Sequence, residues 1–367
     1  MNCILTADRL QRERSTVYES QEMSRILTDD GIELAYESIG SDDDPCIILI
    51  MGLGAQMRVW PDSLCHALVK KGFRVIRFDN RDTGDSTALD HHGTPSLVKT
   101  WLSTQFKRKA QIPYTLRDMS RDVIALMDTL KIDSAHLVGA SMGGMIAQIL
   151  AAKQKRRVRS LTSIMSSATS PSLPGPKLQV LLQLARRPTP FNREASIRYT
   201  MRMNRLIGSP AYPMDELELR QLAETSFERT STPSGFKRQL VAITAAGDRS
   251  HLLRKIKVPT LVIHGSDDPL IPVRMGLATA AGIRKSKMRV IHGMGHDLPS
   301  GLVPQLSKLL SKHVKKAEKR WQRKIEKKRL KLLEQDEHHV LALPALNDSS
   351  EAKNLLNVVN IRAQPQL

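Results

Sequence analysis

The first half of the chain alternates between short apolar runs and longer stretches with helical periodicity. Residues 46–51 are apolar throughout, as expected for a parallel strand that is buried on both faces of a sheet. Residues 115–130 instead repeat apolar side chains at helical spacing. By the same criteria, further strands are expected at 73–78, 135–138, 159–166 and 287–291, and further helices at 62–71 and 142–152. Strands that alternate with helices predict an α/β fold with a mostly parallel, doubly wound sheet.

Two regions break this alternation. Residues 26–39 hold two short strand patterns around the turn dipeptide Asp30-Gly31, which predicts a β-hairpin. From Thr169 onward, prolines and a glycine interrupt the chain, and residues 177–246 are helical in pattern without a convincing strand. We interpret this region as a helical cap that covers the carboxyl edge of the sheet and shapes a substrate pocket. The predicted divisions are a flexible leader at 1–23, the core at 24–168 and 251–313, the cap at 169–250 and a basic tail at 314–367.

Composition narrows the classes of protein that fit. The sequence has no run of about 18 apolar residues, so no transmembrane helix is predicted. Residues 1–23 are polar and charged without an apolar centre, so a secretory signal is not expected. The three cysteines, Cys3, Cys46 and Cys65, are scattered without metal-ligand spacing. They are expected to be reduced thiols, which favours a cytoplasmic location.

The chain is strongly basic, with a net charge of +19. From Gln305 onward, 14 Lys or Arg residues stand against 7 Asp or Glu residues, so the positive charge is densest near the end of the chain. Residues 306–333 combine this charge with apolar residues three and four apart, which predicts a long basic helix. Its first turns are expected to complete the fold. Its extension is expected to be a solvated tail that could contact an anionic membrane, nucleic acid or a partner helix. Residues 338–367 are predicted to be disordered.

The strongest candidate for chemistry is the serine in Gly139-Ala-Ser141-Met142-Gly143. A predicted strand precedes this motif and a predicted helix follows it, so Ser141 would occupy a sharp turn with its hydroxyl exposed. Glycines stand two residues before and after the serine because a Cβ at either place would clash in so tight a turn. The first amides of the helix, including that of Met142, would face an oxyanion formed at Ser141. The pattern predicts a nucleophile rather than an ordinary turn.

A second glycine-rich turn follows the apolar run at 46–51. Gly52-Leu53-Gly54 supplies two glycines of a dinucleotide-binding fingerprint, but Met57 occupies the place of the third. We favour an amide-rich turn that faces the nucleophile and offers the backbone N–H of Leu53 as a second oxyanion donor. Residues 79–86 form a polar loop after the next strand. Their charges are expected to brace that loop rather than to perform chemistry, because loops at a sheet edge need side-chain partners for their backbone.

An acid and a histidine follow later strands. The sheet is expected to resume with a further strand at 258–264. Asp267 and Asp268 come just after it, and Pro269 behind them would hold the acid on a rigid turn. His292 and His296 come after the last predicted strand. Serine, acid and histidine therefore follow strands in the order noted for one hydrolase architecture.

These motifs together resemble the α/β-hydrolase fold family over residues 24–313, and especially its branch of polyketide (anthracycline) methylesterases and related esterases. The motifs that carry the resemblance are Ile50-Met-Gly-Leu-Gly-Ala-Gln56 with Trp60-Pro61, Phe78-Asp-Asn-Arg-Asp-Thr-Gly84, Gly139-Ala-Ser-Met-Gly143, His264-Gly-Ser-Asp-Asp268-Pro269 and Gly293-Met-Gly-His296. Many members have His-Gly at the oxyanion turn, where this chain has Met51-Gly52, a form similar to that of the methylesterase branch. The resemblance is specific for fold and triad and weakly specific for substrate.

The resemblance also implies roles for individual residues. In the family pattern the acid precedes the proline, so Asp268 is preferred to Asp267, which becomes a solvent-facing or turn-capping neighbour. The histidine ends a Gly-x-Gly-His motif, so His296 is preferred. His292 and His264 are then expected to be packed or hydrogen-bonded at strand ends.

The implied activity is that of a serine esterase acting on a small-molecule ester. Ser141 would attack the ester carbonyl, His296 would take its proton, and Asp268 would orient the imidazole. Serine rather than aspartate at this position argues against a dehalogenase or an epoxide hydrolase. No metal or organic cofactor is expected. An acyltransferase or peptidase of the same fold, and a binding protein that works through its basic tail, stay open as alternatives, as do the acyl and alcohol parts of the substrate and the oligomeric state.

Overall fold

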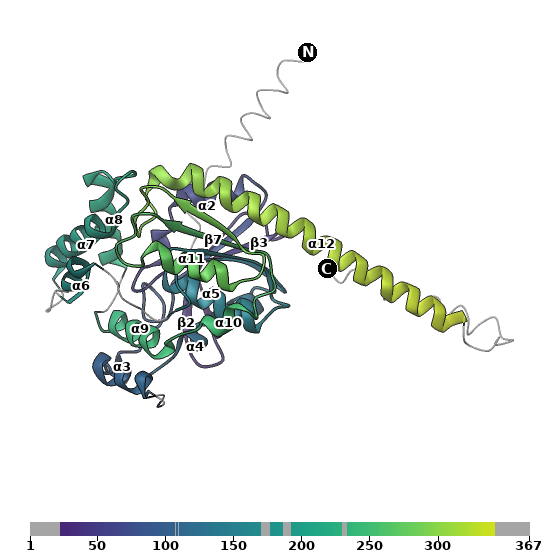
Figure 1. Cartoon of the computed structure of the whole chain (residues 1–367), viewed down its shortest axis with the longest axis horizontal. Coiled ribbons are helices and arrows are strands. Elements are labelled where there is room, and N and C mark those ends of the chain that lie inside the picture. The colour runs from purple at the N-terminus through teal and green to yellow at the C-terminus, as the bar shows by residue number, and fades with distance from the viewer. Residues whose placement is uncertain are drawn as a thin grey trace, which may run out of the picture. The chain divides into compact units, whose positions relative to one another are not determined.

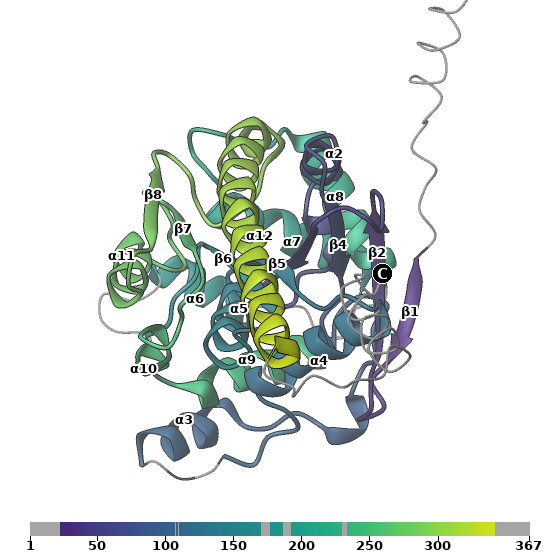
Figure 2. The same ribbon diagram turned by 90° about the vertical axis from the view of Figure 1, so that its right-hand side faces the viewer.

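The apolar runs of the sequence form the strands of one eight-stranded sheet. The strands are β1 Ser24–Leu27, β2 Glu33–Ile39, β3 Cys46–Ile50, β4 Arg74–Phe78, β5 Ala135–Ala140, β6 Val158–Ile164, β7 Thr260–Gly265 and β8 Lys287–Ile291. Their order across the sheet is β1-β2-β4-β3-β5-β6-β7-β8, and Figure 2 shows β1 at one edge and β8 at the other. β1 and β2 form the predicted hairpin, β2 pairs antiparallel with β4, and every later pairing is parallel.

The computed structural model describes residues 23–106, 108, 110–169, 177–185, 192–229 and 233–341. The chain divides into two units, Met1–Val314 and Lys315–Leu367, and the sheet lies in the first. Residues 1–22 of the predicted leader at 1–23 and most of the predicted disordered segment at 338–367 lie outside the described residues.

Helices cover both faces of the sheet. Those outside the region between β6 and β7 are α2 Asp62–Val69, α3 Leu97–Gln105, α4 Leu116–Thr129, α5 Met142–Lys153, α11 Val273–Gly282 and α12 Val303–Leu341, with short 3₁₀ turns η1 Met57–Val59, η2 Asp90–His92 and η3 Ser300–Leu302. In Figure 1, α2 and the start of α12 lie above the sheet, whereas α4 and α5 lie below it. The doubly wound α/β architecture predicted from the sequence is therefore confirmed.

The two-sided cover explains why β3 is apolar at every position. Ile48 and Ile50 pack into one hydrophobic cluster with α4 and α5, whereas Ile47 and Leu49 pack into a second cluster with α2 and the first turns of α12. Every residue of β3 is buried. A strand that faces apolar helices on both sides leaves no position at which a polar side chain would meet water.

The region between β6 and β7 is helical, as its sequence pattern predicts. It contains α6 Leu178–Ala185, α7 Arg193–Ile207, α8 Glu216–Glu228, α9 Pro233–Ala246 and the short α10 Ser250–Leu253. Asparagine and aspartate side chains cap two of these helices, because Asn192 accepts from the Ala195 amide and Asp215 from the Glu218 amide. We refer to α6–α9 as the insertion.

The last helix is longer than predicted. α12 continues to Leu341, so residues 338–341, predicted to be disordered, are helical. The apolar spacing breaks near Lys328, but the helix does not, because side-chain spacing sets which face is buried and not whether backbone hydrogen bonds form. The helices α3 and α11 were not predicted from the sequence. Within the described ranges, no helix combines the length and apolar character that a membrane span requires.

The imidazole of His313, on the first part of α12, makes the stability of this fold sensitive to acid. Burial, with a smaller contribution from the charge of His136, lowers the pKa of His313 to about 4. The unfolded chain takes up this proton near pH 6.5, so folding free energy is lost as the pH falls from about 6.5 to 4. Between pH 7 and pH 5, wild type should lose about 2 kcal/mol more than His313→Gln, measured by urea unfolding. Equal losses in the two proteins would show that His313 is not the group responsible.

Candidate active site

Ser141 occupies the turn between β5 and α5 in a strained backbone conformation. Its φ of 53° and ψ of −119° lie in a region that non-glycine residues rarely adopt. A Cβ on Gly139 would meet the backbone of Gly143, and a Cβ on Gly143 would meet the carbonyl oxygen of Ile50, both far inside van der Waals contact. The glycines two residues on either side thus let the turn close and let it approach the end of β3, as the sequence analysis expected.

The turn that follows β3 lies against the nucleophile. A Cβ on Gly52 would stand 3.0 Å from the Cβ of Ser141, so the backbone here passes directly beside the serine. Leu53 follows and lines the same cavity as Ser141. Met142 is the first residue of α5, and its amide is one of the four at a helix start that have no intrahelical acceptor. The structure therefore brings both predicted oxyanion donors next to the turn that holds Ser141.

Ser141, His296 and Asp268 form a hydrogen-bonded chain. His296 Nε2 lies 3.0 Å from Ser141 Oγ, and His296 Nδ1 lies 2.7 Å from Asp268 Oδ2. The other carboxylate oxygen of Asp268 accepts from the amides of Leu270 at 2.9 Å and Ile271 at 2.8 Å. Asp268 and His296 are both buried, with 6% and 8% of their surface exposed. This arrangement lets the imidazole take a proton from the serine while the carboxylate fixes its tautomer.

A second imidazole also contacts the acid. His264, fully buried on β7, places its Nε2 2.7 Å from the Ile271 carbonyl oxygen and 3.3 Å from Asp268 Oδ2. Burial by itself raises the pKa of Asp268, but the charges and hydrogen bonds of His296 and His264 outweigh it and hold the pKa at about 2. Asp268 is therefore ionised at neutral pH. His264 was expected to be packed or hydrogen-bonded at a strand end, and it is both, but its contact with the acid was not expected.

Asp267 and His292, the less favoured candidates for the acid and the histidine, do not join the hydrogen-bonded chain described above. Asp267 turns away from the imidazole, because its Oδ2 accepts from the Gly293 amide at 3.1 Å, which is the turn-capping position expected for it. His292 follows β8, as expected, but it is exposed, so the expectation that it is packed is wrong. The reason is that β8 is an edge strand with mostly exposed side chains.

A mostly apolar cavity of about 270 Å³ opens beside Ser141 and His296. Helices of the insertion form much of its wall, with polar contributions from Tyr199, Thr200 and Asn204. The apolar lining from the insertion comprises Met203, Ile207, Met214, Leu222, Phe227 and Phe236. Among the described residues, no group of three or more His, Cys, Asp or Glu side chains is arranged to hold a metal ion. The geometry thus offers an apolar binding space that ends at a serine hydroxyl.

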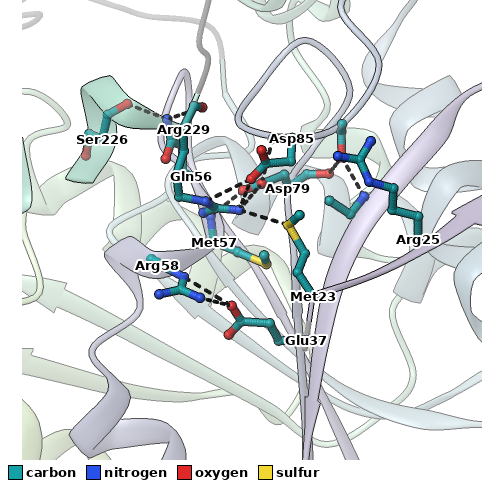
Figure 3. Close-up of polar contacts among 12 residues, drawn as sticks. Met23, Arg25, Glu37, Gln56, Met57, Arg58, Asp79, Asp85, Ser226 and Arg229 are labelled. Carbon is teal, nitrogen blue, oxygen red and sulfur yellow. Dashed lines mark hydrogen bonds and ion pairs between the residues drawn. The ribbon is translucent and has the colours of Figure 1, made fainter. Parts of the chain in front are cut away.

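The charged residues of the 79–86 loop are used for bracing, as expected. Asp79 is fully buried, and its Oδ1 accepts from the Met57 amide at 2.6 Å. Its Oδ2 accepts from the Asp85 amide at 3.1 Å and pairs with Arg229 at 2.8 Å (Figure 3). Burial raises the pKa of Asp79, and the Arg229 guanidinium limits that rise. Asp82 is likewise paired with the buried Arg238 at 2.7 Å.

Comparison with known proteins identifies relatives of the whole core. The model of the alpha/beta hydrolase fold family matches residues 45–299. The chain is 27% identical to rhodomycin D methylesterase DauP of Streptomyces sp. (strain C5) over 329 residues, which covers 80% of this chain and 99% of that protein. It is 26% identical to rhodomycin D methylesterase DnrP of Streptomyces peucetius over 314 residues, with the same two coverages. The crystal structure of the enol-lactonase from Burkholderia xenovorans LB400 superposes with a TM-score of 0.60 at 24% identity, over 80% of this chain and 99% of that one, which supports the fold.

Replacement of Gly143 by alanine tests the close approach of the serine turn to β3. The added Cβ would overlap the backbone of Ile50, which cannot move without shifting a central strand. We expect Gly143→Ala to lower the free energy of unfolding by about 1–3 kcal/mol or more, measured by thermal or urea unfolding. Gly301→Ala is the matched control, because a Cβ there makes ordinary contacts at 3.7 Å. If both variants were as stable as wild type, the two backbones would not be as close as described.

Proposed function

Because the chain belongs to the α/β-hydrolase fold family, we propose that it is a carboxylic ester hydrolase with Ser141 as its nucleophile. The observation that carries this proposal is the hydrogen-bonded chain from Ser141 through His296 to Asp268, at 3.0 Å and 2.7 Å. The two methylesterases among its relatives, which match this chain over almost their whole length, support the same reaction class.

The first half of the proposed reaction acylates the serine. His296 Nε2 accepts the proton of Ser141 as Oγ attacks the ester carbonyl, and Asp268 stabilises the imidazolium that forms. The carbonyl oxygen becomes an oxyanion and accepts from the amides of Leu53 and Met142. A donor of this kind typically lowers the barrier by about 3–4 kcal/mol. The imidazolium then protonates the leaving alcohol, which leaves an acyl-enzyme.

The second half returns the enzyme to its starting state. His296 takes a proton from a water molecule, the hydroxide attacks the acyl-enzyme, and Ser141 regains its proton when the acid leaves. We prefer water as the acyl acceptor because two relatives that match over 99% of their length are named as methylesterases. An acyltransferase or peptidase would use the same residues with a different second nucleophile or leaving group.

The cavity supports a class of substrate. Its lining beside Ser141 is mostly apolar, with aromatic rings from Phe227 and Phe236. Burial of apolar surface would therefore supply most of the binding free energy, and we propose an ester whose bound part is mainly uncharged and apolar. The insertion α6–α9 acts in this proposal as the predicted cap. Contact between the exposed basic residues of 315–330 and an anionic membrane or nucleic acid stays a prediction, as does the cytoplasmic location.

Labelling with a fluorophosphonate probe tests the nucleophile. Wild type should be labelled and should hydrolyse p-nitrophenyl esters, whereas Ser141→Ala should not be labelled and should lose at least about a thousandfold in kcat. Ser41→Ala, which changes an exposed serine in the loop before β3, should behave as wild type. A folded wild type that neither reacts with the probe nor hydrolyses any ester would refute the hydrolase proposal.

A panel of p-nitrophenyl esters with acyl chains of rising length tests the apolar cavity. We expect kcat/KM to rise by roughly threefold to fourfold for each methylene added until the cavity is filled, because each buried CH₂ contributes about 0.8 kcal/mol. Longer chains should then lose activity. As a control, an acyl chain of equal length that ends in a carboxylate should be a poorer substrate. A kcat/KM that does not change with chain length would mean that the acyl group does not enter this cavity.

A further inference from the structure

The turn that carries the Leu53 amide is held by the insertion as well as by the sheet. Residues 52–55 form a turn closed by a hydrogen bond from the Ala55 amide to the Gly52 carbonyl at 3.3 Å, with Gly54 at a φ of +63°. Gly52 lies against Ser141 on one side of Leu53. Gly54, on the other side of Leu53, contacts α9. The position of the Leu53 amide therefore depends on contacts from both directions.

Gln239 of α9 binds the residue that directly follows Leu53, the proposed oxyanion donor. Its Oε1 accepts from the Gly54 amide at 2.7 Å. Its Nε2 donates to the Arg81 carbonyl at 2.8 Å and to Thr83 Oγ1 at 2.7 Å. Since a backbone carbonyl can only accept, Nε2 has to face Arg81, and this fixes Oε1 toward Gly54. Gln239 is fully buried, so water cannot replace these bonds.

The end of α8 holds Gln56, which follows residues 52–55, and we refer to residues 52–57 together as the 52–57 turn. Gln56, which is 3% exposed, donates through Nε2 to the carbonyl oxygens of Ser226 at 2.6 Å and Arg229 at 3.1 Å (Figure 3). These carbonyls belong to the end of a helix, where backbone acceptors have no intrahelical donor. The Met57 amide donates to Asp79, and Arg229 pairs with Asp79 at 2.8 Å. The turn is thereby attached to the insertion at Gly54 and Gln56, and through Asp79 at Met57.

From these contacts we propose that Gln239 and Arg229 are positioning residues for the oxyanion hole. They hold the 52–57 turn so that the Leu53 amide faces the carbonyl oxygen attacked by Ser141. The insertion then has two roles, since the helices that line the cavity also set one of the two donors that stabilise the oxyanion. This inference rests on the proposed function, because it assigns a role within the same reaction.

The test compares Gln239→Leu with wild type. Leucine has a similar volume but cannot accept from Gly54, so the amide of Leu53 should lose its fixed position. We expect kcat to fall by about tenfold to a hundredfold while KM changes by less than about twofold, because the lost interaction acts in the transition state. Inhibition by an alkyl trifluoromethyl ketone, which forms an oxyanion on Ser141, should weaken by the same factor as kcat. Inhibition by the matching alkyl ether, which forms none, should be unchanged.

Thr244→Val is the matched control on α9. Thr244 is half-buried and bonds through its hydroxyl to the Leu240 carbonyl of its own helix, so this change loosens the insertion without touching the turn. It should leave kcat and the trifluoromethyl ketone inhibition as in wild type. If Gln239→Leu does not fold, Arg229→Met replaces it as the test and Arg220→Met, which changes an exposed arginine, replaces the control. Arg229→Met should then lower kcat with little change in KM, and Arg220→Met should behave as wild type.

The outcomes separate this inference from the proposed function. A wild type without ester hydrolysis or probe labelling would overturn the proposed function, and the inference with it. A wild type that hydrolyses esters, together with a folded Gln239→Leu of unchanged kcat, would overturn the inference alone. Equal changes in kcat and in both inhibitors, or the same loss in Thr244→Val, would also overturn it, because the insertion would then act only on substrate binding or on general stability.

Discussion

The site depends on one constraint, which is that the carboxyl ends of parallel strands meet at the same edge of a sheet. In the observed register, Ile50 of β3 lies opposite Gly139 of β5, and Gly265 of β7 lies opposite Ile291 of β8. The turns after these four strands therefore begin at the same edge, with only β6 between β5 and β7, although more than 200 residues separate the first from the last. Each turn contributes one part of the proposed machinery. The proposed catalytic residues can therefore come from distant parts of the sequence, because the register of the sheet brings their turns close together.

At that edge of the sheet, the charged group that is most costly to bury is the carboxylate of Asp268. Burial opposes its charge, and two backbone amides and two imidazoles offset this cost. His264 stabilises the carboxylate through its contact with Asp268. Gly276 leaves room for the His264 imidazole, since a Cβ at position 276 would overlap the ring. The ionised state of the acid is thus a property of the packing of β7 against α11 as much as of the triad.

The sequence was sufficient for the fold and for naming three residues, Ser141, Asp268 and His296, that the structure brings into one hydrogen-bonded chain. Ser141 lies in a motif whose glycines are needed for steric reasons, and Asp268 and His296 follow strands that are recognisable by their apolar runs. The contacts of Gln239 and Arg229 could not be found in this way. Gln239 is 185 residues from Gly54, and nothing local distinguishes it from any other glutamine on a helix. The exposure of His292 was misjudged because the sequence does not show which strand lies at the edge. The helix α3 was missed because its apolar side chains do not form one buried face: Leu97, Val98, Trp101 and Leu102 are all exposed.

The attachment of α9 to the 52–57 turn has a consequence for how such proteins can diverge. Regions inserted between core strands are often treated as interchangeable parts, which evolution or a protein engineer can swap to obtain a new specificity. Here an exchanged insertion would have to bring its own acceptor for the Gly54 amide, in the place that Gln239 occupies. A chimera that copied only the shape of the cavity would bind its new substrate and turn it over slowly. If Gln239 has the proposed positioning role, a change of specificity through the insertion would also change the rate, because both would depend on the helix that carries this side chain.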